Sequence, residues 1–168
     1  TDYFFNFMKQ VFPDPNQLRS MEFWGGEPSY GLPRVVKTVR NAINHYHNLN
    51  TFMMSTNLTT ETWLDDFCSF FFMLKEFPER RFEFHLQLSL DGPTYINDLN
   101  RGKGVTDLFT RNFSKLLFNL ERILNDVPNV TIQAFFKPTL DNSSISLLYV
   151  SILFCSICIS TSCASSIF

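Results

Sequence analysis

Two glycines and a glutamate follow a short apolar segment near the start of the chain. The stretch MEFWGGEP places Gly25, Gly26 and Glu27 directly after residues that are typical of a buried strand. Because glycine has no Cβ, a ligand can approach the backbone there within hydrogen-bonding distance. The carboxylate of Glu27 beside this bare backbone suits an ammonium group. A plain strand-to-helix turn with an exposed glutamate has the same composition, so these residues indicate a ligand site only together with others.

A second polar group follows a later strand, in the stretch LSLDGPTYINDLNRG. Ser89 lies on the polar face of that strand, and Asp91 comes just after it. Arg101 follows a turn or loop later and carries a guanidinium that can return to an anionic group. A strand end with solvent-exposed charges would contain the same residues. The second group therefore also indicates a ligand site only if the fold brings it close to the first group.

Strands and helices alternate along the chain in an order that would bring both groups together. Apolar strands are predicted at about residues 21–24 and 51–55, and alternating polar and apolar residues predict strands at about 82–90 and 130–137. Helical periodicity predicts one helix from Pro33, one from about Thr60 and one long helix after Pro93. Connections of this length imply right-handed crossovers between parallel strands.

The polar face of the last two strands decides between two α/β architectures. In the third strand this face consists of Glu83, His85, Gln87 and Ser89. A doubly wound sheet buries both faces and has almost entirely apolar strands, whereas the concave interior of an open barrel accepts polar residues. We therefore predict an α/β fold with a partial (β/α) barrel of parallel strands in preference to a Rossmann-like sheet. In either fold, ligands bind at the carboxyl ends of the strands.

In their order along the chain, these motifs resemble the radical S-adenosylmethionine superfamily. Gly-Gly-Glu-Pro after one strand, STN after the next, and LSLDGP with ND and NRG after the third are most similar to its peptide-modifying branch, which includes anaerobic sulfatase-maturating enzymes. The resemblance covers about Met21 to Leu140. It implies a fragment that comprises roughly strands two to five of a radical S-adenosylmethionine barrel.

The resemblance implies a cofactor, a reaction and a partner. The parent enzyme would use a reduced [4Fe-4S] cluster to cleave S-adenosylmethionine to a 5′-deoxyadenosyl radical, which abstracts a hydrogen from a protein or peptide substrate. Gly25, Gly26 and Glu27 match the motif that holds the amino group of the cofactor's methionine moiety.

Further residues match the family in the later strands. Ser89 matches a strand residue that contacts the ribose or carboxylate of the cofactor, and Arg101 matches an arginine that pairs with the carboxylate. Asn57 and Gln133 stand at positions that line the cleft. Asp91 and Asp98 lie in the same matching stretch, where they would orient Arg101 or meet the substrate.

The cysteines depart from the family pattern. The family binds its cluster through Cys-x-x-x-Cys-x-x-Cys ahead of Gly-Gly-Glu, whereas no cysteine precedes Met21 here. Because DYFFNFMKQVF is similar to the helix that follows the cluster loop, we expect the loop and the first strand to be missing. The isolated chain would then bind the cofactor without cleaving it, and we predict no catalytic and no metal-binding residue. Cys68 is expected to pack as a small hydrophobe.

Residues 142–168 form an uncharged tail rich in serine, isoleucine, cysteine and phenylalanine, after a predicted barrel domain of residues 1–141. Its FCSICISTSC stretch differs in order and spacing from the family's cluster motif. We expect the tail to be foreign to the fold, as a frame change or retained non-coding sequence would make it. A membrane span, or a native buried helix and strand, are the alternatives.

Composition limits the partners. The formal net charge of −2 gives no electrostatic reason to expect nucleic acid. The first residues show no secretory signal, so we expect a cytoplasmic protein with membrane contact disfavoured. Two rival functions stay open: a non-catalytic α/β interaction protein that kept the barrel but lost the cluster, and a membrane-anchored protein that uses the tail.

Overall fold

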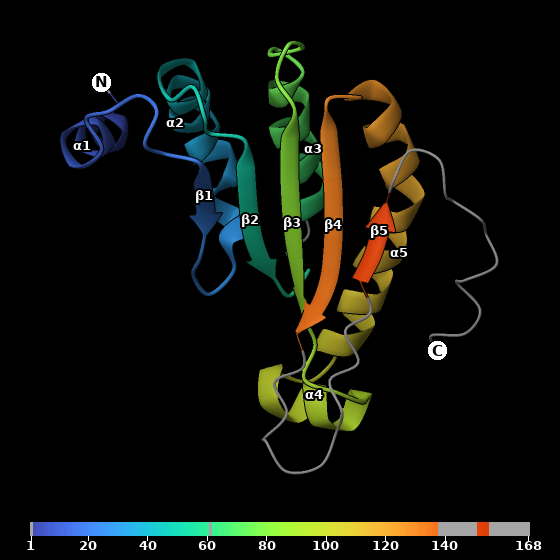
Figure 1. The fold of residues 1–168 in the computed structure, drawn as a ribbon. Helices are drawn as coiled ribbons and strands as arrows, with labels where there is room; N and C mark the ends of the chain where they lie inside the picture. The colour runs from blue at the N-terminus through green and yellow to red at the C-terminus, as the bar shows by residue number, and fades with distance from the viewer. Residues whose placement is uncertain (1, 61, 138–150, 155–168) are drawn as a thin grey trace.

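The computed structural model describes residues 2–60, 62–137 and 151–154. Helices and strands alternate along these residues, as Figure 1 shows. Their bounds are α1 (Tyr3–Val11), β1 (Ser20–Phe23), the 3-10 helix η1 (Pro28–Gly31), α2 (Leu32–His45), β2 (Thr51–Thr56), α3 (Trp63–Leu74), β3 (Phe82–Ser89), α4 (Thr94–Arg101), α5 (Val105–Asp126), β4 (Val130–Lys137) and β5 (Ser151–Phe154).

The strands form one sheet in the order β1-β2-β3-β4-β5. Strands β1 to β4 pair in parallel, with Met21 opposite Phe52 and Phe52 opposite Phe84. This confirms the predicted α/β fold with a parallel sheet. Strand β5, which falls in the tail, pairs with β4 in the antiparallel direction. The parallel prediction therefore holds for the four strands that the sequence indicated, and β5 adds a strand that it did not.

The helices that connect the strands pack on one face of the sheet, behind it in Figure 1. Aromatic rings fill the space between α3 and the sheet. The ring of Phe84 on β3 lies 5.5 Å, 5.6 Å and 4.9 Å from the rings of Phe67, Phe70 and Phe71, centroid to centroid. All four side chains are fully buried. Burying each such ring stabilises the fold by about 1.5–3 kcal/mol, so this apolar layer holds β3 against α3.

The opposite face carries the polar residues that the alternation predicts. Glu83 is exposed, and His85, Ser89 and Gln133 are half-buried. Gln87 differs, because its side chain is buried while its amide donates a hydrogen bond to the hydroxyl of Ser55 on the neighbouring strand (3.0 Å). No helix within the described residues covers this face in Figure 1.

The long helix expected after Pro93 is two helices, α4 and α5. Gly102 and Gly104 separate them at φ +116° and +81°, a backbone conformation that a helix cannot continue through and that glycine adopts at little cost. The carboxylate of Asp98 accepts hydrogen bonds from the amides of Gly104 (2.8 Å) and Thr106 (2.9 Å). These bonds satisfy amides at the start of α5 that have no partner inside the helix.

The described residues contain no helix of sufficient length and apolar character to cross a membrane.

Candidate functional site

The backbone at the end of β1 is unobstructed. Gly25 has φ +151°, and a Cβ built on Gly25 or on Gly26 would meet no atom within 4 Å. The exposed side chain of Trp24 precedes them, and its indole N–H donates to the carboxylate of Glu22 (2.8 Å). This hydrogen bond holds the indole close to β1. No described side chain therefore blocks the approach of a ligand to the backbone of the two glycines.

Glu27 joins the ends of two neighbouring strands. Its Oε1 accepts a hydrogen bond from the hydroxyl of Thr56 (2.7 Å), and its Oε2 accepts one from the amide of Asn57 (2.8 Å). Oε1 also accepts from the amide of Ser29, which makes Glu27 the N-cap of η1 (3.2 Å). A carboxylate has about four acceptor sites, so these three bonds leave one of them for a ligand.

Asn57 lies beside Glu27, as the sequence predicts, but its side chain serves its own loop. Its Oδ1 accepts hydrogen bonds from the amide (3.1 Å) and the hydroxyl of Thr59. Leu58 follows with φ +54° and is fully buried. The amide of Asn112 on α5 donates to the carbonyl of Leu58 (2.5 Å), which holds the loop against the helix layer. The loop that follows β2 is thus held in position by α5.

Ser89 ends β3 on the open face. Its hydroxyl oxygen lies 3.3 Å from that of Ser55 on β2, which in turn accepts from Gln87. Parallel strands are about 4.8 Å apart, so the ends of β1 and β3 are separated by about 10 Å, with β2 between them. Ser89 and the two glycines therefore stand at the same edge, within reach of one small molecule.

Arg101 is held in place by Asp91. Its Nη2 lies 2.6 Å from Oδ1 of Asp91, an ion pair in which the Asp91 side chain is 8% exposed and the Arg101 side chain 24%. The Nε of Arg101 is buried and has no hydrogen-bond partner among the described residues. The backbone amide of Asp91 donates to the Asn97 side chain (3.0 Å), which fixes the acidic partner as well. Of the two aspartates predicted to orient Arg101 or meet substrate, Asp91 contacts it and Asp98 instead caps α5.

Gln133 does not join this group. It lies in the middle of β4, opposite His85 on β3. Ser89 is opposite Lys137, so Gln133 lies four residues, or about 13 Å, back along the strand direction. His85 stands 3.7 Å from the carboxylate of Glu83, and its Nε2 is buried without a hydrogen-bond partner in the described part of the chain. Gln133 and His85 thus belong to the middle of the open face.

The sequence pattern identified the glycines, Glu27, Asn57, Ser89 and Arg101 at one edge of the sheet. The STN stretch placed Ser55 and Thr56 at this edge as well, but gave no role to their hydroxyls, which hold Ser89 and Glu27. The polar Ser-Thr end of an otherwise apolar strand was the available signal for both.

Metal ligands are absent from what the structure describes. No group of three or more histidine, cysteine or acidic residues could hold a metal ion in residues 2–60, 62–137 and 151–154. Cys68 is buried on α3, where burial, the largest influence, raises the pKa of its thiol. This position agrees with its predicted role as a small hydrophobe. Cys155, Cys158 and Cys163 lie outside the described residues.

Comparisons with protein-family models, curated proteins and solved structures found no match to this chain.

Proposed function

We propose that this chain binds the methionine end of S-adenosylmethionine at the carboxyl ends of β1 to β3, as part of a radical S-adenosylmethionine enzyme of the peptide-modifying branch. The observation that carries the proposal is the unobstructed backbone of Gly25 and Gly26 beside the Glu27 carboxylate. A fixed carboxylate and a guanidinium at the same edge of the sheet match the two charged groups of a bound amino acid, its ammonium and its carboxylate, and the bare backbone lets it approach closely.

The chain's own residues would divide the binding as follows. The carboxylate of Glu27 has one acceptor site left for the ligand's ammonium group. The buried Nε of Arg101, which has no partner among the described residues, supplies a donor for the ligand's carboxylate, and Asp91 holds the guanidinium in position. The hydroxyl of Ser89 is available as a further contact at the end of β3.

The placement of the helices supports the barrel part of the proposal. The connecting helices cover one face of the sheet, and the polar alternation of β3 and β4 faces the other way. An open barrel has this arrangement, whereas a doubly wound sheet carries helices on both faces.

The radical chemistry belongs to the parent enzyme as a whole. With a reduced [4Fe-4S] cluster beside it, the bound cofactor would be the source of a 5′-deoxyadenosyl radical for a protein or peptide substrate. The described residues offer no ligand set for that cluster, so the proposal assigns them cofactor binding and orientation only.

A non-catalytic α/β binding protein is the second candidate. The observation in its favour is that Glu27 already uses three of its acceptor sites to cap η1 and to join β1 to β2. In that case the Gly-Gly-Glu stretch would be a rigid turn, and S-adenosylmethionine would not bind there.

A substitution at Gly26 separates the two candidates. A Cβ at this position meets no protein atom, so Gly26→Ala should fold like the unchanged chain while filling the space in front of the backbone. We expect calorimetric titration to show S-adenosylmethionine binding that Gly26→Ala weakens by at least about tenfold, which corresponds to about 1.4 kcal/mol.

Gly31→Ala is the matched control, because a Cβ there also meets nothing and Gly31 lies away from the strand end, at the start of α2. It should bind like the unchanged chain. Equal affinity of all three proteins, or no binding by any of them, would favour the non-catalytic candidate.

A further inference from the structure

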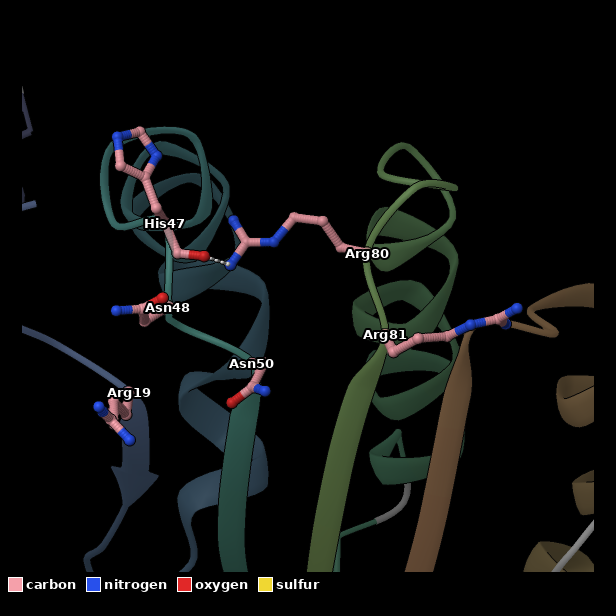
Figure 2. A pocket seen from close by; sticks show the side chains of 6 residues that line it. All are labelled: Arg19, His47, Asn48, Asn50, Arg80 and Arg81. Carbon is pink, nitrogen blue, oxygen red and sulfur yellow. Dashed lines mark hydrogen bonds between the residues drawn. The ribbon is translucent and has the colours of Figure 1, made fainter. Parts of the chain in front are cut away.

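A polar pocket lies at the opposite edge of the sheet, where the strands begin. Its volume is about 450 Å³, and Figure 2 shows the residues that line it: Arg19, His47, Asn48, Asn50, Arg80 and Arg81. Arg19 precedes β1, Asn50 precedes β2, and Arg80 and Arg81 precede β3. Three neighbouring strands thus contribute to it, and none of the residues at the carboxyl edge does.

The lining is positively charged in a chain whose net charge is negative. Three of the six lining residues are arginines and none is acidic, although the formal net charge of the chain is −2. Glu79 interacts electrostatically with Arg80, and the backbone amide of Glu83 donates to the carbonyl of Asn50 (2.9 Å), but neither acid is among the lining residues. A hollow lined by one sign of charge concentrates ions of the opposite sign. The pocket therefore favours anions.

Arg80 supplies a fixed charge at the back of the pocket. Its guanidinium reaches across to the end of α2 and donates to the carbonyls of Ile43 (2.5 Å), Tyr46 (3.3 Å), His47 (3.0 Å) and Leu49 (2.6 Å). Figure 2 shows it beside His47, above Asn50. With these donors occupied, Arg80 attracts an anion through its charge, not through new hydrogen bonds.

Arg19 and Asn50 supply the donors. The backbone amide of Asn50 donates to the backbone carbonyl of Arg19 (3.1 Å), so the two residues are neighbours on adjacent strand starts. The side-chain Oδ1 of Asn50 accepts from the hydroxyl of Thr51 (3.1 Å), and its side-chain NH₂ makes no hydrogen bond with a described residue. The Arg19 side chain is exposed, and its guanidinium makes no hydrogen bond or ion pair with any described residue. Arg81 turns away toward the start of β4 in Figure 2, where it donates to the carbonyl of Pro128 (3.1 Å). The donors left for a ligand are thus the Arg19 guanidinium and the side-chain amide of Asn50, on residues whose backbones are hydrogen-bonded.

We propose that this pocket binds a phosphorylated small molecule, with its phosphate between the Arg19 guanidinium and the side-chain amide of Asn50. Arginine binds phosphate oxygens through two parallel hydrogen bonds, and the fixed charge of Arg80 adds attraction without rearrangement. Pockets for small organic ligands have volumes of about 300–1,000 Å³, so this one has room for an organic group beside the phosphate. The ligand class is therefore a phosphate monoester.

The test is an NMR titration of the ¹⁵N-labelled chain with inorganic phosphate and, separately, with glycerol 3-phosphate. Saturable shifts should appear at the amides of residues 19–20 and 47–51, and glycerol 3-phosphate should bind more tightly than phosphate. Arg19→Gln should weaken both by about tenfold or more, because a charged hydrogen-bond donor is lost. Arg34→Gln removes an exposed arginine on α2 outside the pocket and should bind like the unchanged chain.

Three results would overturn the proposal. Equal affinities of Arg19→Gln and Arg34→Gln would show that the anion responds to overall charge only. Shifts absent from residues 19–20 and 47–51 would exclude the pocket. If glycerol 3-phosphate bound no more tightly than phosphate, the pocket would not recognise an organic group, and the proposal of a phosphate monoester would be wrong. Because the Arg19 side chain is exposed and makes no hydrogen bond with any described residue, Arg19→Gln should not unfold the protein. An NMR spectrum that is unchanged outside the pocket verifies this.

Discussion

Glu27 and Arg101 are the two charged residues on which the cofactor proposal depends, and both already bind protein groups. Glu27 accepts bonds from Ser29, Thr56 and Asn57, and Arg101 pairs with Asp91. The sequence indicates that Glu27 stands beside bare backbone, because the glycines are adjacent to it. It gives no signal for the bonds to Thr56 and Asn57, which lie about thirty positions away along the chain. The same two side chains therefore hold the site rigid and would bind the ligand.

Arg80 is a charged residue whose hydrogen bonds hold the fold together. Its guanidinium binds carbonyls at and just after the end of α2, which have no partners within the helix. Burial, the largest influence, lowers the pKa of Arg80 from its ordinary value, and Glu79 opposes this shift. The acceptors come from a segment more than thirty residues earlier, so no local pattern in the sequence predicts them.

Replacing Arg80 by methionine should therefore destabilise the protein. Arg80→Met keeps much of the side-chain volume but leaves the α2 carbonyls without their donors, so we expect the free energy of unfolding to fall by about 2–3 kcal/mol. Urea unfolding followed by circular dichroism measures it. Arg81→Met, which loses one bond at an exposed position, should cost less than about 1 kcal/mol. Similar losses in both variants would contradict the role given to Arg80.

At the scale of the elements, the sequence predicted the existence of the main helices and strands better than their ends. Alternation identified β3 and β4, and the 3.6-residue period identified α2, α3 and α5. The break between α4 and α5 was missed, because Leu108 and later apolar residues extend a stripe that hides it. The NRGKG stretch carried the signal, since two glycines near the end of a helical pattern commonly terminate it. The short turn η1 was missed because glutamate is an unusual N-cap.

Asp98 makes the α4–α5 junction sensitive to acid. Hydrogen bonds from the side chain and amide of Thr106, then from the amide of Gly104, hold the pKa of this carboxyl below its ordinary value of 3.8. A carboxyl with a lowered pKa in the folded state contributes stability above its unfolded pKa and loses it as pH falls through the folded pKa. Asp98→Asn should therefore lower stability at neutral pH and make the acid loss of stability below about pH 4 less steep.

Urea unfolding of both proteins at a series of pH values tests this dependence. Asp107→Asn is the matched control, because Asp107 is exposed in the same first turn of α5 and makes no side-chain hydrogen bond to a described residue. It retains the junction's bonds and should follow the unchanged chain more closely than Asp98→Asn does. Parallel pH profiles for Asp98→Asn and the unchanged chain would contradict the assignment.

At the scale of the whole molecule, the two ends of the parallel strands carry different sets of polar residues. The carboxyl edge of the sheet carries the glycines, Glu27 and the Asp91–Arg101 pair, and its amino edge carries the arginine-lined pocket. The sequence predicts the first edge, because parallel crossovers bring all strand ends together. It does not predict the second, which combines single residues from three separate segments. The sequence also does not predict the antiparallel pairing of β5 with β4, because nothing in the residues of β5 specifies which strand it pairs with or in which direction.

The most direct test of the central claim is an NMR titration of the ¹⁵N-labelled chain with S-adenosylmethionine. The account predicts saturable shifts at the amides of Gly25, Gly26, Glu27 and Asn57, at Ser89, and at the Nε–H of Arg101, with residues 47–51 at the amino edge unchanged. No saturable shift at up to millimolar cofactor, or shifts confined to other parts of the chain, would contradict it.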